Sequence, residues 1–270
     1  MLPLLRSRLP AAGMLPAEQR RALLLVDKHS AGRASLLAAA RKRIVALLGR
    51  ADSRDFYTGE GQRRLAGDLA AIDRIAQTSF AGRTTAYLDA VARQVRQPEP
   101  TKVEPLPARP RGVDPVEVWL RPFEQFRYEY AKSQDEDLAR KALLNRADLI
   151  LGDDLALGMR IATRNHAQAA RTVIGQRRVI HPEVSKGGTC GLCLAASHQM
   201  YRPGDLQPLH QGCECTTAEV FRDADPGTLM NRDSLETVYA AAGGTGRQEL
   251  QRVRFKIVPH SELGPTLAAA

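Results

Sequence analysis

The sequence predicts a mainly α-helical protein with a small α+β module toward its C-terminal end. Apolar residues recur at spacings of three and four over most of the chain up to Gly175. Aromatic residues make up only 5% of the 270 residues, while alanine, leucine and arginine abound, which favours helices packed through small side chains. All four cysteines lie in one window, residues 189–215, where the helical periodicity has ended.

The first predicted element is a long helical hairpin within residues 1–96. Pro16 suits a first helical turn, and the helix that follows it should stop at Gly49, with residues 30–32 as a place where it could break. A second helix follows a polar stretch, and its apolar face consists of Leu65, Leu69, Ile72, Ala76, Phe80, Leu88, Val91 and Val95. Two helices of this length, joined by a short connection, should pack side by side.

The positive charge of the protein is concentrated in this hairpin. Residues 1–50 contain ten Lys or Arg and two acids, Glu18 and Asp27, so they carry +8 of the total net charge of +9. Such a basic segment can bind a polyanion such as DNA through counterion release. A solvated basic helix face with no nucleic-acid partner would have the same composition, and both interpretations stay open.

Residues 97–112 are predicted to be an extended linker, because they hold five prolines and show no apolar periodicity. A second helical unit is predicted over residues 113–176, and it begins with Asp114 and Pro115 as N-cap and first-turn residue. Pro122 should kink this helix or mark a tight turn. Aromatic residues then repeat at helical spacing, which predicts a stripe that packs against a neighbouring helix: Trp119, Phe123, Phe126 and Tyr130.

The rest of this unit is predicted to form two more helices. Asp153 and Asp154 are candidate caps between them, and the second should run to Gly175. His166 lies inside that second helix, and we expect it to be exposed or hydrogen-bonded within the fold rather than to bind a metal.

The cysteines have the spacing of a zinc site. Cys190 and Cys193 form a C-x2-C pair, and His210, Cys213 and Cys215 form H-x2-C-x-C. Two such knuckles can place four ligands around one cation about 2.3 Å from each sulfur, and soft thiolates with an imidazole select zinc. We favour Cys190, Cys193, His210 and Cys213 as ligands, with Cys215 as a substitute or supporting residue. A closed four-ligand site is structural, because it leaves no position for water.

These candidates belong to a predicted Cys/His module over residues 177–222. Two further histidines of the module, His181 and His198, are expected in surface loops. Residues 223–270 are predicted to be a C-terminal extension with a helix, a strand and a frayed tail.

Two other roles for the cysteines stay open. Four cysteines allow three disulfide pairings, although a cytosolic protein would keep none of them permanently. A cysteine nucleophile would need a lowered pKa and an oriented base, and no G-x-S-x-G, H-E-x-x-H or phosphate-binding glycine loop occurs, so no catalytic residue is assigned.

No apolar run is long enough to span a membrane, and the N-terminus lacks a signal-peptide pattern, so we expect a cytosolic product.

The window TCGLCLAASHQMYRPGDLQPLHQGCEC resembles the signature of Mu F-like minor head proteins of tailed bacteriophages. The similarity is to the actinobacteriophage branch, whose members are often named capsid maturation proteins, and it covers residues 113–222. The usual pattern is C-x2-C, a turn with glycine or tyrosine, then H-P-x-C-x-C. The matching residues are Cys190, Cys193, Tyr201, Gly204, His210, Cys213 and Cys215. Gln211 replaces the usual proline and Glu214 the usual arginine.

This resemblance implies a minor capsid protein that acts in head morphogenesis. It would assemble with the portal protein and the major capsid protein in the host cytoplasm, in several copies per head. It would then reside in the virion, in the head interior or at the portal vertex. Two alternatives are a capsid maturation protease with unassigned catalytic residues and a zinc-containing nucleic-acid-binding protein that uses residues 1–50.

Overall fold

The structure is a computed structural model that describes residues 17–100, 102–181, 188–206, 215–230, 235–260 and 264–269. It is mainly helical, as predicted, with an N-terminal helical hairpin, further helices and a small α+β region. Residue contacts divide the chain into two compact units. The bundle unit consists of residues 31–83 and 105–162, and the mixed unit consists of residues 1–30, 84–104 and 163–270.

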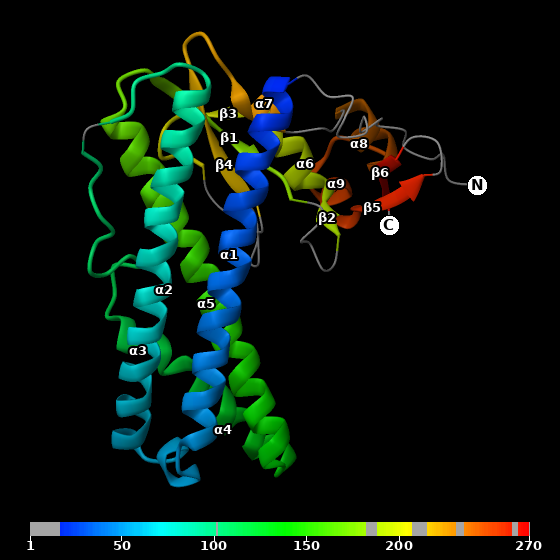
Figure 1. Cartoon of the computed structure of the whole chain (residues 1–270). Helices are drawn as coiled ribbons and strands as arrows, with labels where there is room; N and C mark the ends of the chain where they lie inside the picture. The colour runs from blue at the N-terminus through cyan, green and yellow to red at the C-terminus, as the bar shows by residue number, and fades with distance from the viewer. Residues whose placement is uncertain are drawn as a thin grey trace. The chain divides into compact units, whose positions relative to one another are not determined.

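Three long helices contribute residues to both units (Figure 1): α1 (Ala17–Arg50), α2 (Gly59–Gln94) and α5 (Glu136–Ala169). Helices α1 and α2 form the predicted hairpin. Helix α1 is continuous through residues 30–32, so the break considered there does not occur. One glycine costs a helix only about 1 kcal/mol, and the burial of Ser30 and Arg33 on either side of this point stabilises the helical path.

The core of the bundle unit is aromatic. Helices α3 (Pro115–Trp119) and α4 (Arg121–Ser133) are separated at Leu120, and Pro122 lies in the first turn of α4, so the predicted interruption occurs. Trp119, Phe123 and Phe126 of the predicted core stripe are fully buried, and Tyr130 is partly buried and packs against the same core. The short 3-10 helix η2 (Ser53–Phe56) adds Phe56, whose ring lies 5.4 Å from that of Phe126.

Helix α5 differs from the prediction in two ways. It runs without interruption past Asp153 and Asp154, so neither residue is a cap. Its apolar stripe continues across this point through the buried Leu151, Leu155 and Met159, and this packing outweighs the local capping signal. The helix also ends at Ala169 rather than Gly175, because the β-branched residues that follow begin a strand.

The predicted linker contains no helix or strand in residues 97–100 and 102–112. Leu106 is buried, and its carbonyl accepts a hydrogen bond from Arg74. Arg111 forms an ion pair of 2.5 Å with the buried Asp154 of α5. This segment is therefore anchored to the bundle unit at both places.

The mixed unit contains two small antiparallel sheets. The first has the order β3-β1-β4 and the second the order β2-β5-β6. The strands are β1 (Val173–Val179), β2 (Thr189–Cys190), β3 (Met200–Tyr201), β4 (Thr216–Phe221), β5 (Arg254–His260) and β6 (Gly264–Ala269). The short helices are α6 (Gly191–Ser197), α7 (Pro226–Met230), α8 (Leu235–Ala242) and α9 (Arg247–Arg252).

The C-terminal extension contains the predicted helix and strand, as α8 and β5. Residues 264–269, predicted to be frayed, instead form β6, which pairs antiparallel with β5 in the register Lys256↔Ala268. Among the described residues, no helix combines the length and the apolar character needed to cross a membrane.

Candidate functional site

Three of the five predicted metal ligands lie in one buried cluster of the mixed unit. Cys190, Cys193 and Cys215 are each at most 6% exposed. They share a small core with Leu194, Val238, Leu250 and Phe255, together with neighbouring apolar residues. The cysteines come from separate elements, because Cys190 ends β2, Cys193 lies in the first turn of α6, and Cys215 directly precedes β4. All three are free thiols.

Glycine is required inside the C-x2-C pair because the chain passes very close to α9 and β5. A Cβ atom at Gly191 would collide with the Val253 side chain and would lie 2.8 Å from the Leu250 carbonyl oxygen. The same approach allows the Gly191 amide to donate to the Val253 carbonyl at 3.2 Å. The turn that carries both cysteines is thus fixed against the second sheet.

The thiol of Cys190 has a pKa lowered to about 5. The main cause is a hydrogen bond from the Cys193 side chain to the Cys190 sulfur. Burial opposes this effect, whereas the backbone amides of Cys193 and Leu192 and the charge of Arg254 add to it. Cys190 and Cys193 are therefore in direct contact, as a C-x2-C turn requires.

Cys215 has a cationic neighbour of its own. Arg178, on β1, is completely buried, and its Nη1 lies 2.6 Å from the Cys215 sulfur. The Arg178 guanidinium also lies over the Tyr201 ring, 5.9 Å from its centre. Arg178 thus places a buried positive charge beside this sulfur.

The histidines of the module differ from expectation in one case. His181 is not in an exposed loop: it is 2% exposed, and its Nε2 lies 2.8 Å from the Thr216 hydroxyl. Residues 180 and 181 follow β1 directly, so they continue into the buried interior. His198 is half-buried. The predicted ligands His210 and Cys213 lie outside the described residues, and within the described part no group of three or more His, Cys, Asp or Glu is arranged to hold a metal.

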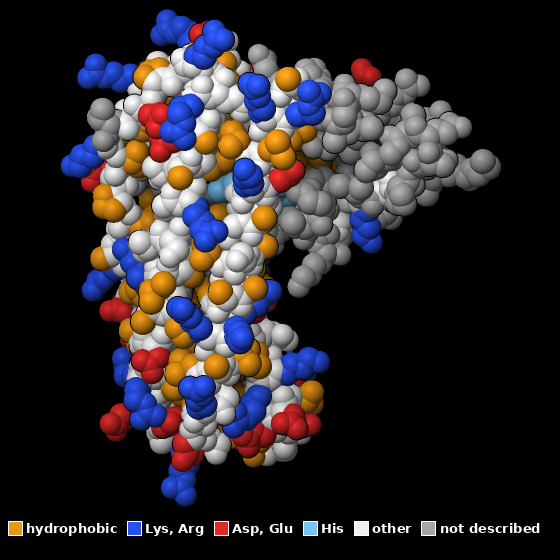
Figure 2. Space-filling model, viewed as in Figure 1, with side chains coloured by type: hydrophobic (Ala, Val, Ile, Leu, Met, Phe, Trp, Pro, Cys, Tyr) orange, Lys and Arg blue, Asp and Glu red, His pale blue; other side chains and the backbone are white. Residues whose placement is uncertain are grey.

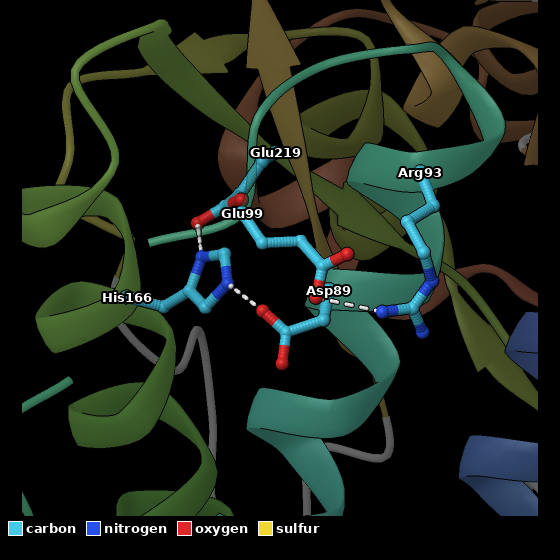
Figure 3. A network of polar contacts seen from close by, with 5 residues as sticks. All are labelled: Asp89, Arg93, Glu99, His166 and Glu219. Atoms are coloured by element: carbon cyan, nitrogen blue, oxygen red, sulfur yellow. Dashed lines mark hydrogen bonds and ion pairs between the residues drawn. The ribbon is translucent and has the colours of Figure 1, made fainter. Parts of the chain in front are cut away.

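A second polar site of the mixed unit centres on His166, which is completely buried near the end of α5. Its Nδ1 lies 2.8 Å from Glu219 Oε1 on β4, and its Nε2 lies 3.0 Å from Asp89 Oδ1 on α2 (Figure 3). We call these three residues the histidine–carboxylate triad. Figure 3 also shows the neighbouring ion pair of Arg93 and Glu99, at 2.7 Å.

The triad favours a protonated imidazole. Burial alone would lower the pKa of His166, but the hydrogen bonds and charges of Glu219 and Asp89 outweigh it, and the pKa of His166 is raised. The pKa of Glu219 is also raised, because its burial outweighs the hydrogen bond and charge of His166. Glu219 is 0% exposed, and among the described residues its Oε2 has no hydrogen-bond partner. Asp89 is the most exposed member, at 23% of its side chain.

This geometry limits what His166 can do chemically. Both ring nitrogens already face carboxylate oxygens, so neither is available to take a proton from a serine or cysteine nucleophile. Nearby, burial and the charge of Glu219 raise the pKa of Tyr87, whose ring stacks on His29 at 4.4 Å. The triad is thus part of a buried polar interior and has the character of a structural ion-pair network.

The sequence contained a partial signal for this site. His166 continues the buried stripe of α5 formed by Leu155, Met159 and Ala162, at spacings of three and four. Glu219 gave no such signal, since both faces of β4 are buried and its strand pattern does not distinguish them. The hydrogen bonds of His166 agree with the expectation of a residue satisfied within the fold.

Comparison of the chain with family models, with curated proteins and with solved structures finds no match.

Proposed function

We propose that this chain is a minor head protein of a tailed bacteriophage, which assembles with portal and capsid proteins and stays in the virion. The proposal rests on the signature over residues 189–215. The observation that carries it is the gathering of Cys190, Cys193 and Cys215 in one buried cluster, as expected if the signature forms a folded module. The long helices of both units suit a scaffold that binds other structural proteins.

We further propose that the module folds around zinc. The residues present fit this ion in kind, because Cys190, Cys193 and Cys215 are soft sulfur donors in one small core. His210 and Cys213 would complete the set. The burial of Cys215 in the same cluster supports a ligand role for it over a supporting one. When bound, zinc crosslinks its ligands and supplies folding free energy to a segment with little apolar bulk.

The head-protein proposal is tested by mass spectrometry of proheads and virions made from a genome that carries this gene. The chain should be found in at least one of the two particles, in several copies per head. Its absence from both, with portal and capsid proteins detected normally, would overturn the proposal whatever the metal content of the chain.

The zinc proposal has a separate test. Elemental analysis of protein purified without chelator should find about one zinc per chain. Cys190→Ser and Cys215→Ser should lower the zinc content and unfold the mixed unit. Ala195→Ser is the matched control, because it changes a buried residue of α6 that is not a donor, and it should keep the metal. Zinc-free wild-type protein with intact structure would contradict the proposal.

The two alternative functions gain no support from the described residues. The protease requires a base that can reach a nucleophile, and His166 is already engaged on both ring nitrogens. DNA binding by residues 1–50 would weaken steeply as salt is added. Undetectable or salt-insensitive binding to a DNA duplex would remove it.

A further inference from the structure

A groove in the mixed unit combines an apolar floor with a basic rim. It has a volume of about 930 Å³ and is lined by the first turns of α1, the end of α2 and the segment that leads into α7. Its apolar lining includes Leu24, Leu25, Val95 and Pro226. Leu24 is 58% exposed, so its side chain is accessible to a partner.

The α1 wall of the groove has the pattern of a helix-binding stripe. Four lining residues lie along one face of this helix, because they are spaced by three, one and three positions: Arg21, Leu24, Leu25 and Lys28. Helix α1 also packs against its own core, and other residues, including the buried Ala22 and Val26, make that contact. Within the stripe, Leu25 also packs against this core, whereas Leu24 is exposed and available to a partner.

The charged residues described in the groove are of one sign. Among the residues that the structure describes, its lining contains four basic residues, Arg21, Lys28, Arg93 and Arg96, and no acid. Arg93 pairs with Glu99, whereas Arg21, Lys28 and Arg96 have no acidic partner among the described residues. In Figure 2, Lys and Arg side chains recur among apolar ones on the face formed by α1.

The far wall of the groove is held by backbone hydrogen bonds. Arg96, two residues after the end of α2, adopts a left-handed conformation with φ of 57°. The Gln97 amide donates to the Ala92 carbonyl at 2.9 Å, and the Arg96 amide donates to the Arg93 carbonyl at 3.1 Å. This turn ends the helix and fixes where Arg93 and Arg96 emerge.

We infer that this groove binds an acidic amphipathic helix of a partner protein. Leucines at the centre of the α1 stripe offer contact to the apolar face of such a helix, and the basic residues at both ends select Glu or Asp beside that face. A duplex DNA backbone would supply the charge but no apolar side chains. The described part of the lining contains no aromatic residue on which bases could stack. The first sixteen residues of the chain itself carry Arg6 and Arg8 and no acid, so their charge does not match.

The test uses the full-length protein and a fluorescent synthetic peptide of three heptads, with leucine at positions a and d and glutamate at e and g. Repulsion between the glutamates keeps this peptide from pairing with itself. Fluorescence anisotropy should show saturable binding that weakens as salt is added. A peptide with lysine in place of glutamate, and one with serine in place of leucine, should both bind at least about tenfold more weakly.

Paired variants locate the binding site. Leu24→Asp, and separately the double change Arg21→Glu with Lys28→Glu, should each lower the affinity at least about tenfold. The matched controls are Val45→Asp and the double change Lys42→Glu with Arg43→Glu. Val45 is 53% exposed on the same helix, outside the groove, and the second control changes the net charge by the same amount. Both controls should bind as the wild type does.

Four results would overturn the inference. The first two are the absence of peptide binding and an equal loss of affinity in the groove variants and the control variants. The third is that the serine peptide binds as tightly as the leucine peptide. The fourth is that a DNA duplex displaces the peptide and that this displacement depends on the same groove residues. Because the changed side chains are exposed, circular dichroism should show unchanged helix content in every variant. The outcome is independent of zinc content and of the presence of the chain in virions.

Discussion

The bundle unit and the mixed unit both bury carboxyl groups, but they neutralise them in different ways. In the bundle unit, Asp73 accepts hydrogen bonds from Gln77 at 2.8 Å and from Trp119 at 3.2 Å. Burial, and then the charge and hydrogen bond of Asp154, raise the pKa of Asp73 to about 8. Near neutral pH this acid therefore keeps its proton.

The mixed unit places a cation directly beside Glu219, whereas the cation of the bundle unit, Arg111, pairs with Asp154 and not with Asp73. Glu219 faces His166, whose raised pKa favours the charged imidazolium, and Asp89 lies at the other ring nitrogen. An amide can imitate a protonated carboxyl group, but it cannot replace a charge. Replacing the buried acid by its amide should therefore cost little stability in the bundle unit and much more in the mixed unit.

The largest effect is expected from the aromatic core of the bundle unit, to which the Asp73 partner Trp119 belongs. Phe123→Ala should lower the free energy of unfolding by about 3–5 kcal/mol, because Phe123 is completely buried and its removal leaves a cavity. Denaturant unfolding measures the loss. Tyr128→Ala is the control on the same helix: Tyr128 is 65% exposed, so its removal should cost less than about 0.5 kcal/mol. Equal costs would mean that α4 does not pack as described.

The second-largest effect is expected from a substitution that removes one charge of the Glu219–His166 pair in the mixed unit. Glu219→Gln should cost about 3 kcal/mol, because it leaves the His166 cation short of one counter-charge and buries new amide hydrogens where Oε2 has no described partner. Chemical denaturation at neutral pH measures it. Glu236→Gln, at an exposed position of α8, should be close to neutral. A negligible cost at Glu219 would show that the triad carries no ion pair.

The contrasting substitution is Asp73→Asn, which should change how stability depends on pH. The folded pKa of Asp73 is raised above the unfolded value, so its contribution is complete below about pH 4 and is lost as pH rises toward about 8. Between about pH 6 and pH 9 the wild type should lose about 2 kcal/mol that the asparagine variant keeps. Urea unfolding across this range tests it, and parallel pH profiles for the two proteins would contradict it.

The parts of the fold that were predictable are those fixed by neighbours along the chain. The hairpin and the stripe of Trp119, Phe123 and Phe126 follow from apolar spacing, since one helical face must be buried. The predicted caps at Asp153 and Asp154 were wrong, because the apolar stripe of α5 continues through them. The local capping signal of these two residues was overridden, because the apolar packing of the helix is continuous on both sides of them.

The candidate sites show the same limit. The C-x2-C spacing identified Cys190 and Cys193, which are indeed in contact, and Cys215 lies in the same cluster. The triad joins residues 53 and 77 positions apart in the sequence. Its members come from α2, α5 and β4, and no periodicity within one element specifies which distant carboxyl group will meet a buried histidine.

The smallest effect is expected at Asp89, and it compares the two carboxyl groups that contact His166 in the triad. Asp89→Asn should cost about 1 kcal/mol, less than Glu219→Gln, because Asp89 is partly exposed and solvent screens its charge. The raised pKa of His166 makes its contribution complete below about pH 6.5, and this contribution is lost as pH rises through the folded pKa. Removing Asp89 should bring that loss to lower pH, so the two proteins should differ most in mild acid and converge in base. NMR titration of the His166 ring together with denaturant unfolding measures both changes, with the exposed Asp205→Asn as control. A difference that stays constant with pH would mean that Asp89 acts as a neutral hydrogen-bond acceptor and that Glu219 alone holds the charge of His166.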